Sequence, residues 1–378
     1  MPPTRFLLQD PTEVMPAEMG LFMDAERPYD PSRVRAESEA LREVLSGFGD
    51  VVTVRRALEA IPREELLALA QEAVAAPTSD RLKSAWEALD GWTATDLAEM
   101  VVRRPRLELH EDPEIALISP DCSYESYVTR PLFGLMFPRD HYVDLGGPVA
   151  LARLRRRDRA RETDVLEKVL RALRGRAADH VPADGLFLEG GDVATAESLA
   201  VVGCGFRTSP EAAGALVPLL ASGGRQVLEV RDGVRSPGAF HLDHWFSLGP
   251  GLALVARDRL DDPRVVATVH PAEQDRPSGP SSPLTLREAL ECTGTSVLAL
   301  TPEEVEGFAA NVFFVPGKRS VIVSEAAHDP VARLLDPHGF EISTVPFDAH
   351  HQQFGSVHCA VNTLAPADVA SPIQEDTT

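Results

Sequence analysis

Residues 312–323 read Val-Phe-Phe-Val-Pro-Gly-Lys-Arg-Ser-Val-Ile-Val, and this stretch predicts a β-hairpin. Two apolar runs rich in valine and phenylalanine flank a Pro-Gly turn, which is the pattern of two paired strands. A helical run follows at 331–335, and the apolar strand-like runs at 198–204 and 296–300 are also each followed by a helical run. Strands that alternate with helices along the chain indicate an α/β domain.

The N-terminal part has a different pattern. Residues 5–8 predict a short strand, and Asp30-Pro31-Ser32 predicts a helix start because proline suits the first helical turn. From 57 to 103 the pattern is helical and poor in strand formers. We therefore expect a helical subdomain between parts that contain strands.

Composition narrows the class of protein. The 378-residue chain has a formal net charge of −21, so it is a poor candidate for binding nucleic acid or an anionic membrane and suits a small cationic substrate. Its four cysteines include no CxxC pair, which fits a reducing cytoplasm better than a disulfide scaffold. The N-terminus has no cationic segment followed by a long apolar run, so neither a signal peptide nor a membrane span is expected.

One cysteine lies in a stretch of small residues, Phe354-Gly355-Ser356-Val357-His358-Cys359. Glycine lets the backbone approach a ligand closely. A thiol attacks only as its thiolate, which a neighbouring imidazolium or a cationic substrate favours. Cys359 is therefore a candidate nucleophile, and the alternative is a buried structural cysteine, the interpretation given to Cys204 and Cys292.

Three further segments place acidic or basic groups beside small or turn residues: Phe-Pro-Arg-Asp at 137–140, Leu-Glu-Gly-Gly-Asp at 188–192 and His-Leu-Asp at 241–243. If the last segment is a strand, His241 and Asp243 project from the same face and form one wall of a pocket. Each segment also has a plainer interpretation: a surface ion pair, a tight turn with a solvated glutamate, and a strand end facing water.

Together these segments supply one cysteine, one histidine and three carboxylates, and this set suits the chemistry of a guanidinium group. Carboxylates can hold its N–H groups in pairs and fix its plane. A thiolate above that plane can then add to the central carbon, and a histidine can protonate the departing nitrogen.

In this order the segments resemble the guanidino-group modifying superfamily, and most closely bacterial arginine deiminase. The similarity runs from about 101 to 364 and includes Gly-Cys-Gly-Phe-Arg-Thr-Ser at 203–209 and His-Cys at 358–359. The helical block at 57–103 is similar to a helical insertion that arginine deiminases carry.

The resemblance implies a role for each residue. Cys359 would form a covalent amidino-thioether intermediate, and His241 would be the general acid for ammonia loss and then the base that activates water. Asp140 and Asp243 would clamp the guanidinium, and Glu189 would orient His241. The expected substrate-binding residues are Arg207 and Arg159, at positions that hold the amino acid carboxylate, and Phe137, which can stack on the guanidinium or pack in the core.

The fold implied is a five-bladed α/β propeller (pentein) of ββαβ modules with a helical insertion and a central active site. No metal or organic cofactor is implied, and a homo-oligomer is left open. The expected division of the chain is a first module at 1–56, the helical insertion at 57–103, the remaining modules with the catalytic centre at 104–364, and a disordered tail at 365–378.

Two positions depart from the deiminase pattern. Deiminases usually have an arginine five positions before the cysteine, where this chain has Phe354, and an asparagine six positions before the first aspartate, where it has Gly134. Both changes remove polar partners for the amino acid end of arginine. Arginine and a modified guanidine therefore both stay open as substrates.

Other readings of the same residues stay open. An amine instead of water can resolve the Cys359 intermediate, which would make the protein an amidinotransferase, and a dihydrolase would release two ammonias. A non-catalytic alternative is a zinc site, because imidazole and thiolate are the usual ligands of zinc. Its expected ligands are His350, His351, His358 and Cys359.

Overall fold

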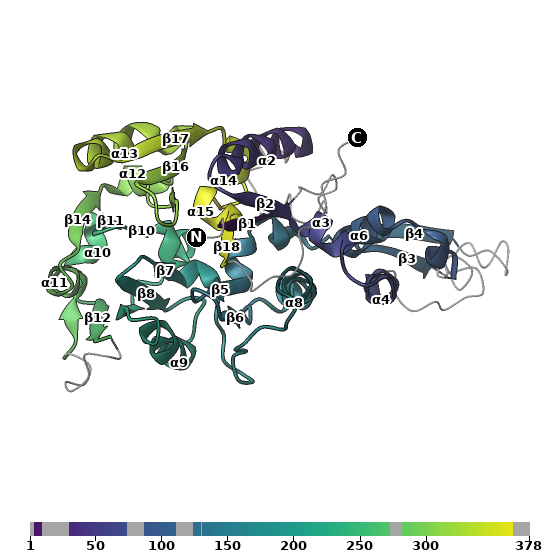
Figure 1. Ribbon diagram of the computed structural model, residues 1–378, viewed down its shortest axis with the longest axis horizontal. Coiled ribbons are helices and arrows are strands. Elements are labelled where there is room, and N and C mark those ends of the chain that lie inside the picture. Colours follow the sequence, from purple (N-terminus) through teal and green to yellow (C-terminus); the bar gives the residue numbers. More distant parts are fainter. Residues whose placement is uncertain are drawn as a thin grey trace.

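The computed structural model of the chain describes residues 4–9, 30–73, 87–110, 124–129, 131–272 and 282–365. Over these ranges, strands form separate sheets of two to five strands flanked by helices (Figure 1). Within 312–323, β15 (Phe313–Phe314) and β16 (Ser320–Ser324) pair antiparallel, so the predicted hairpin and the mixed α/β fold are confirmed.

One supersecondary unit recurs along the chain. In its clearest copy, β7 (Val193–Thr195) and β8 (Leu199–Cys204) form an antiparallel pair. The helix α9 (Pro210–Ala221) then crosses over, and β9 (Gln226–Asp232) returns parallel to β8. Each unit therefore has the order strand, strand, helix, strand, with one antiparallel and one parallel pairing.

Four other sets in the described residues follow the same order, and one of them joins the two ends of the chain. These sets are β18 (Asn362–Leu364), β1 (Arg5–Leu8), α2 (Pro31–Ser46) and β2 (Asp50–Thr53); β5 (Tyr142–Asp144), β6 (Val149–Leu151), α8 (Ala160–Arg174) and a single parallel bridge from Ala150 to His180; β10 (Phe246–Gly249), β11 (Leu252–Ala256), α11 (Leu286–Cys292) and β14 (Ser296–Leu300); and β15, β16, α13 (His328–Leu335) and β17 (Glu341–Val345). Of the strands outside these five units, β12 (Val265–His270) and β13 (Leu284–Thr285) extend the sheet of β9.

The helices cover the sheets through apolar side chains. In α9, Leu216 and Leu220 belong to one buried cluster with Val202 of β8 and Val227 of β9. Figure 1 shows α2, α9, α11 and α13 at the outline of the body, with the short helix α15 (Val357–Ala360) near its middle. The cysteine segment thus lies inward of the covering helices.

Local signals in the sequence explain how α2 begins and ends. The Asp30 side chain accepts hydrogen bonds from the backbone N–H groups of Ser32 at 2.9 Å and Arg33 at 3.2 Å, which satisfies donors that have no partner inside the helix. Pro31 is the first helical residue, and Gly47 caps the other end. The predicted helix start is confirmed, as is the strand at 5–8.

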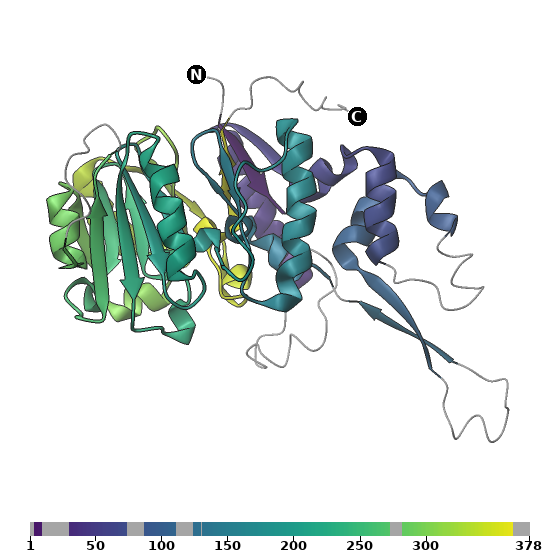
Figure 2. The same cartoon turned by 90° about the horizontal axis from the view of Figure 1, so that it is seen from below.

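The expected helical insertion corresponds to α3 (Val54–Glu59), α4 (Arg63–Ala73) and α6 (Ala94–Arg103), which continue into a hairpin of β3 (Pro105–His110) and β4 (Tyr124–Thr129). These three helices bury Leu58, Leu66 and Leu97 in one cluster with Val165 and Leu170 of α8. Figure 2 shows the hairpin extending away from these helices. The sequence pattern predicted the helices but not the hairpin.

Some expectations stay predictions. The sheets among the described residues are separate and none closes on itself, so the mixed α/β fold is observed and the propeller arrangement is not. The division of the chain at 56, 103 and 364 stays a prediction too. Of the tail predicted to be disordered, Ala365 donates its N–H to Asp144 at 2.8 Å, and 366–378 lie outside the described residues.

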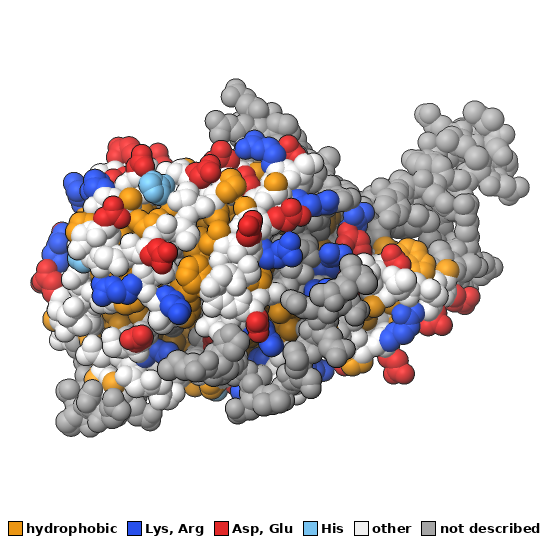
Figure 3. Space-filling view, turned by 45° about the horizontal axis from the view of Figure 1, so that its top comes forward, with side chains coloured by type: hydrophobic (Ala, Val, Ile, Leu, Met, Phe, Trp, Pro, Cys, Tyr) orange, Lys and Arg blue, Asp and Glu red, His pale blue; other side chains and the backbone are white. Residues whose placement is uncertain are grey.

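The surface carries both signs of charge. On the face shown in Figure 3, lysine and arginine side chains are interspersed with acidic ones, so on that face the excess of acid does not form a single patch. Within the described ranges, every helix is too short or too polar to cross a bilayer.

Candidate active site

Cys359 lies in α15, where the side chain of Asn311 holds it in place. Its backbone N–H donates to Asn311 Oδ1 at 3.3 Å, and Asn311 Nδ2 lies 3.1 Å from the Cys359 sulfur. The loop before α15 passes so close to Phe137 that a Cβ on Gly355 would lie 2.4 Å from its ring. Glycine is therefore required at 355, and the small-residue approach to the cysteine has a steric cause.

Asp243 lies on the other side of the sulfur. Cys359 Sγ is 3.3 Å from Asp243 Oδ2, and His358 Nδ1 donates to the same oxygen at 2.9 Å. Burial by itself would raise the pKa of Asp243, but this hydrogen bond and the nearby imidazoles hold the pKa well below its usual range. Asp243 Oδ1 is buried without a hydrogen-bond partner and is free to accept from a bound cation.

His241 is paired with two other carboxylates. Its Nε2 is 2.7 Å from Glu189 Oε2, and its Nδ1 is 3.6 Å from Asp140 Oδ1. Burial alone would lower the pKa of His241, but the negative charges of Asp140, Asp192 and Glu189 and the hydrogen bond to Glu189 raise it to about 10. His241 is therefore an imidazolium at neutral pH, as a general acid must be.

The predicted strand at 241–243 is wrong. His241 is extended, but 242–244 form a 3-10 turn, because Trp245 N–H bonds back to Leu242 O at 3.0 Å. His241 and Asp243 have ligand atoms within 4.8 Å of one another, yet each bonds to a different carboxylate or imidazole. The two residues are brought together by a turn, and not by the alternation of a strand.

The Leu-Glu-Gly-Gly-Asp segment has a steric explanation at each glycine. A Cβ on Gly190 would lie 2.1 Å from the carbonyl oxygen of Arg139, and one on Gly191 would lie 2.7 Å from His241 Nδ1. The two glycines therefore allow the backbone to pass directly beneath His241. Asp192 then accepts backbone hydrogen bonds from Leu242 at 2.9 Å and Thr208 at 3.1 Å, which ties this turn to the His241 turn.

Glu189 is held at its second oxygen as well. Its Oε1 accepts from the Arg155 backbone N–H at 2.9 Å, and Arg207 Nη1 lies 3.8 Å from that oxygen. Burial favours the neutral acid, but the hydrogen bond and charge of His241 lower the pKa of Glu189 below its usual range. Glu189 is thus an anion next to the His241 cation, and their hydrogen bond fixes the position of the imidazole.

Arg159 is bound to the site's own carboxylates. Its Nη1 donates to Asp140 Oδ2 at 2.9 Å, its Nε to Glu162 Oε2 at 2.7 Å, and its Nη2 to the Gly134 carbonyl at 3.2 Å. A Cβ on Gly134 would lie 2.4 Å from this guanidinium, so the absence of a side chain at 134 makes room for Arg159. Asp140 Oδ1 stays buried without a hydrogen-bond partner.

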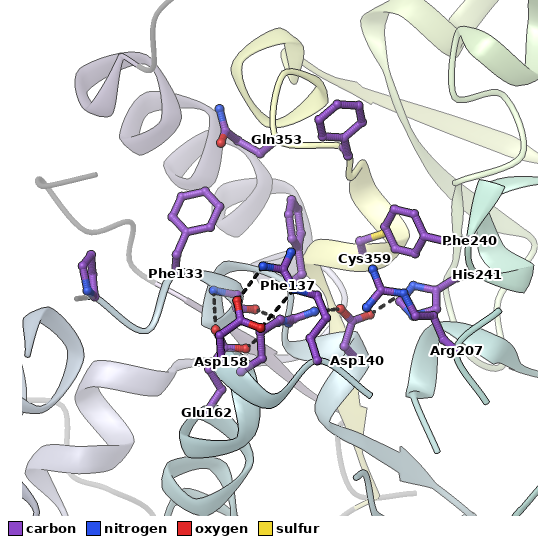
Figure 4. A pocket seen from close by; sticks show the side chains of 15 residues that line it. Phe133, Phe137, Asp140, Asp158, Glu162, Arg207, Phe240, His241, Gln353 and Cys359 are labelled. Atoms are coloured by element: carbon purple, nitrogen blue, oxygen red, sulfur yellow. Dashed lines mark hydrogen bonds and ion pairs between the residues drawn. The ribbon is translucent and has the colours of Figure 1, made fainter. Parts of the chain in front are cut away.

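A cavity of about 650 Å³ joins these groups (Figure 4). The predicted residues that line it are Cys359, His241, Asp140, Arg159, Arg207 and Phe137. Arg207 lies over the Phe240 ring at 4.6 Å from its centroid. Asp243 and Glu189 do not line the cavity and instead contact Cys359 and His241 from behind.

The sulfur is uncharged in the free protein. Burial, together with the negative charges of Asp243 and Asp140, raises the pKa of Cys359 well above its ordinary value. The hydrogen bond from Asn311 acts in the opposite direction. A cation bound between the two aspartates would cancel part of their effect, so thiolate formation should follow substrate binding.

Sequence patterns missed Asn311, Glu162 and Asp192 as parts of this site. Asn311 lies one residue before the predicted hairpin and carried no local signal. Glu162 lies in α8, directly after an arginine-rich stretch at 153–161, and it is buried where Arg159 and His141 both bond to it. Asp192 was visible as the end of the Gly-Gly-Asp turn, but its backbone partners are 16 and 50 residues away.

Two groups of described side chains bring potential metal ligands within 4.8 Å of one another: His241, Asp243 and His244, and Asp140, Glu189 and His241. Both groups use His241, which is an imidazolium bonded to Glu189. A metal needs a neutral imidazole, so the observed pairing suits proton transfer better than metal binding.

The zinc alternative does not fit the arrangement of its four residues. His350 Nδ1 bonds to Glu37 at 2.7 Å, and His351 Nε2 bonds to Ser356 at 3.0 Å, while His358 and Cys359 both contact Asp243. Over the ranges that the structure describes, these four do not form a common ligand group.

The fold and the site define an α/β protein with a buried cysteine and a protonated histidine, each in contact with carboxylates. Residues 54–365 match the family model of arginine deiminase. Since this is most of the chain, the chain belongs to the arginine deiminase family.

Solved structures of other proteins share this fold. The N-terminal domain of ArgZ, described as an arginine dihydrolase from the ornithine–ammonia cycle in cyanobacteria, matches 97% of this chain and 98% of its own at 13% identity and a TM-score of 0.58. An adduct of dimethylarginine dimethylaminohydrolase matches 96% of this chain and 100% of its own at 14% identity and a TM-score of 0.55. At these identities the likeness shows a shared fold.

Unliganded AgrE matches 97% of this chain at 17% identity and a TM-score of 0.56, but the match covers only 40% of AgrE. This chain therefore spans less than half the length of that relative. A sequence comparison with curated proteins found no match.

Proposed function

We propose that this protein is a cysteine-dependent hydrolase that converts the guanidino group of arginine or an arginine-like substrate to a ureido group and ammonia. The observation that supports this proposal most strongly is that two different reactive groups, each in contact with carboxylates, lie beside the same cavity. One carboxylate-backed group is a buried thiol, the other is an imidazolium, and both line one cavity.

The guanidinium would contact Asp140 at the cavity wall and reach Asp243 beside the Cys359 sulfur, and the Oδ1 atoms of both carboxylates are buried without a hydrogen-bond partner. Such oxygens gain most from an added N–H donor because they are already removed from water. The bound cation would lower the pKa of Cys359, and the resulting thiolate would add to the central carbon of the guanidinium.

His241 would then donate its proton to a substrate nitrogen as the C–N bond breaks, which releases ammonia and leaves an amidino-thioether on Cys359. Now neutral, His241 would take a proton from water as that water adds to the same carbon. The hydroxyl group of that adduct would lose its proton to solvent as the C–S bond breaks, which forms the ureido C=O and returns the thiolate. Glu189 would hold the imidazole in position through both steps.

We assign Arg159 to orienting Asp140, because its guanidinium is already bonded to Asp140, Glu162 and the Gly134 carbonyl. Phe137 and Arg207 would contact the substrate from the cavity wall. We also propose that the five recurring units form the five-bladed propeller expected from the family resemblance, with the insertion α3–α6 outside it.

The test is ammonia release from a panel of guanidines, with mass spectrometry of the protein during turnover. Wild-type protein should release one ammonia per ureido product and carry an amidino adduct on Cys359, and Cys359→Ala should do neither. An adduct that decays only when an amine is added would instead indicate amidino transfer. Two ammonias and a free amine would indicate a dihydrolase.

A probe for the guanidinium site alone is 2-chloroacetamidine, which has an amidinium and an alkylating carbon and nothing else. It should alkylate Cys359 of wild-type protein with loss of chloride. The variant Asp140→Asn should slow this labelling, because it removes a carboxylate from the cation site. A folded wild-type protein that is not labelled would count against the proposed function.

A further inference from the structure

The cavity has two unlike sides. In Figure 4, Cys359, His241 and Arg207 lie to one side, and Phe133 lies at the other. Aromatic rings line it throughout: Phe133, Phe137, Phe240 and Phe354, with Pro131 beside them. The reacting groups therefore lie at one end of a space whose remaining wall combines these rings with the charged side chains of Arg156, Asp158, Arg159 and Glu162.

Two of the three arginines on the cavity wall are already paired with carboxylates. Arg159 bonds to Asp140 and Glu162, and Arg156 bonds to Asp158 through Nε and Nη2. Arg207 lies 3.8 Å from Glu189, which is itself bonded to His241. A carboxylate on the substrate would therefore lose water at this wall and find a single arginine, Arg207, that is not hydrogen-bonded to a carboxylate.

Arg207 also turns its face to a ring and not to open space. Its guanidinium lies 4.6 Å from the Phe240 centroid, and its Nε is buried without a hydrogen-bond partner. Arg207 is thus the lining arginine whose charge is least compensated, and an anion at this wall would depend on this one side chain.

Phe354 adds apolar surface at the cavity rim at a conformational cost. Its side chain is 54% exposed, and its φ is +61°, a region that residues other than glycine seldom adopt. The turn is maintained because Phe354 N–H bonds to His351 O at 3.0 Å, and because Glu37 accepts from the backbone of Ala349 and His350. An exposed ring held in this way presents a ready contact for a ligand.

We propose that the site prefers a guanidine whose substituent is uncharged and apolar, an alkyl or aryl group, over one that ends in a carboxylate and an ammonium. This inference rests on the proposed function, since it concerns the substituent of the same guanidinium. A cavity of about 650 Å³ is within the usual range for small-molecule sites and leaves room for such a group.

The test uses a matched series in which charges are removed from one chain: L-arginine, then agmatine, then n-pentylguanidine, with phenethylguanidine as an aromatic member. The expected result is that kcat/KM for n-pentylguanidine exceeds that for L-arginine by about tenfold or more. Phenethylguanidine should be at least as good a substrate. A kcat/KM for L-arginine equal to or above that for n-pentylguanidine overturns the proposal.

Variants of Phe354, at the rim of the cavity, test whether the substrate preference depends on this side chain. Phe354→Ala should raise KM for n-pentylguanidine several-fold, and Phe354→Leu should restore it, because leucine returns the apolar surface. The rate of labelling by 2-chloroacetamidine should stay unchanged in both, since this probe has no substituent. Trp92→Ala, which removes an exposed aromatic side chain outside the cavity, should change neither readout.

The two proposals fail in different ways. If 2-chloroacetamidine labels Cys359 but no apolar guanidine is turned over, the guanidinium site stands and the inference about the substituent is overturned. If Cys359 of the folded protein is not labelled, the proposed function itself is wrong. A Phe354→Ala variant that binds n-pentylguanidine as well as wild type also overturns the inference.

Discussion

The side-chain amide of Asn311 holds Cys359 at two points, with Oδ1 accepting from the cysteine N–H at 3.3 Å and Nδ2 lying 3.1 Å from the sulfur. The same Nδ2 donates to the backbone carbonyl of Asp243 at 3.0 Å. Asn311 therefore links the cysteine turn to the aspartate turn. An N–H donor at the sulfur stabilises the thiolate, against the burial and the carboxylates that raise the pKa of Cys359.

Asn311→Leu should raise the pKa of Cys359 further and reduce kcat by a factor on the order of 100, the usual loss when one donor to a reacting anion is removed. The measurement is the pH dependence of 2-chloroacetamidine labelling. Labelling should increase with pH as the thiolate forms, and the variant's curve should be displaced to higher pH. An undisplaced curve in a folded variant would argue against a role for this donor.

A matched control is Asn362→Leu. Asn362 is equally buried, and its Nδ2 donates to the Pro138 carbonyl at 3.2 Å and the Tyr142 carbonyl at 3.0 Å, but not to the sulfur. Both variants leave buried carbonyls unpaired, so each should lose about 1–3 kcal/mol of unfolding free energy. Only Asn311→Leu should displace the labelling curve.

A second prediction concerns the charge of the alkylating reagent. Because the free thiol of Cys359 is neutral at pH 7, iodoacetamide should modify it slowly, whereas 2-chloroacetamidine supplies a cation between Asp140 and Asp243 and should react faster. Peptide mapping after timed exposure to each reagent checks this at Cys359, with the exposed Cys292 as an internal reference. Equal selectivity of both reagents for Cys359 over Cys292 would contradict it.

Patterns within a few residues were enough to predict several individual strands and helices. The hairpin at 312–323, the strand at 5–8 and the start of α2 each depend on residues within a few positions of one another, such as Asp30 and Ser32. The recurring unit was expected from the family resemblance but was not visible as a repeat in the residues, because its copies share an order of elements and not a set of residues. The first copy even pairs β1 with β18 from the opposite end of the chain, a relationship that no window of sequence contains.

The same contrast between local and long-range information applies to the candidate active site. The residue types suited to guanidinium chemistry could be identified from four short segments, and the structure brings those segments to one cavity. Which carboxylate contacts which partner could not be predicted from spacing, and only the family resemblance implied that Glu189 orients His241. Spacing suggested that His241 pairs with Asp243, whereas Glu189 lies 52 residues from His241 in the chain and only 2.7 Å from its Nε2.

A third prediction follows from the raised pKa of His241. Its value in the folded protein is about 10, against 6.5 for an unperturbed histidine, so protonation of His241 stabilises the fold. This contribution is fully present below pH 6.5 and is lost as the pH rises through 10. The unfolding free energies of wild type and His241→Gln should therefore differ most below pH 6.5 and converge toward pH 10, as denaturant titrations at several pH values would measure.

Activity gives a separate check on the same residue. His241→Gln should reduce kcat by a factor on the order of 100 to 10,000, because the leaving nitrogen loses its proton donor. Labelling by 2-chloroacetamidine needs no such donor, since chloride leaves without a proton, and should be affected much less. If labelling and turnover fall by the same factor, His241 is needed for binding and not as an acid.

The last prediction tests why two glycines follow Glu189. In Gly191→Ala the new Cβ would lie 2.7 Å from His241 Nδ1 and 3.2 Å from Asp140 Oδ1, so the imidazole must leave its present position. A displacement of this size should reduce kcat on the order of 100-fold. The helical Gly214 is a matched control, because a Cβ there meets nothing within 4 Å. Gly214→Ala should keep full activity and gain up to about 1 kcal/mol of stability from helix propensity. Full activity in Gly191→Ala would mean that the contact between this backbone and His241 does not position the imidazole.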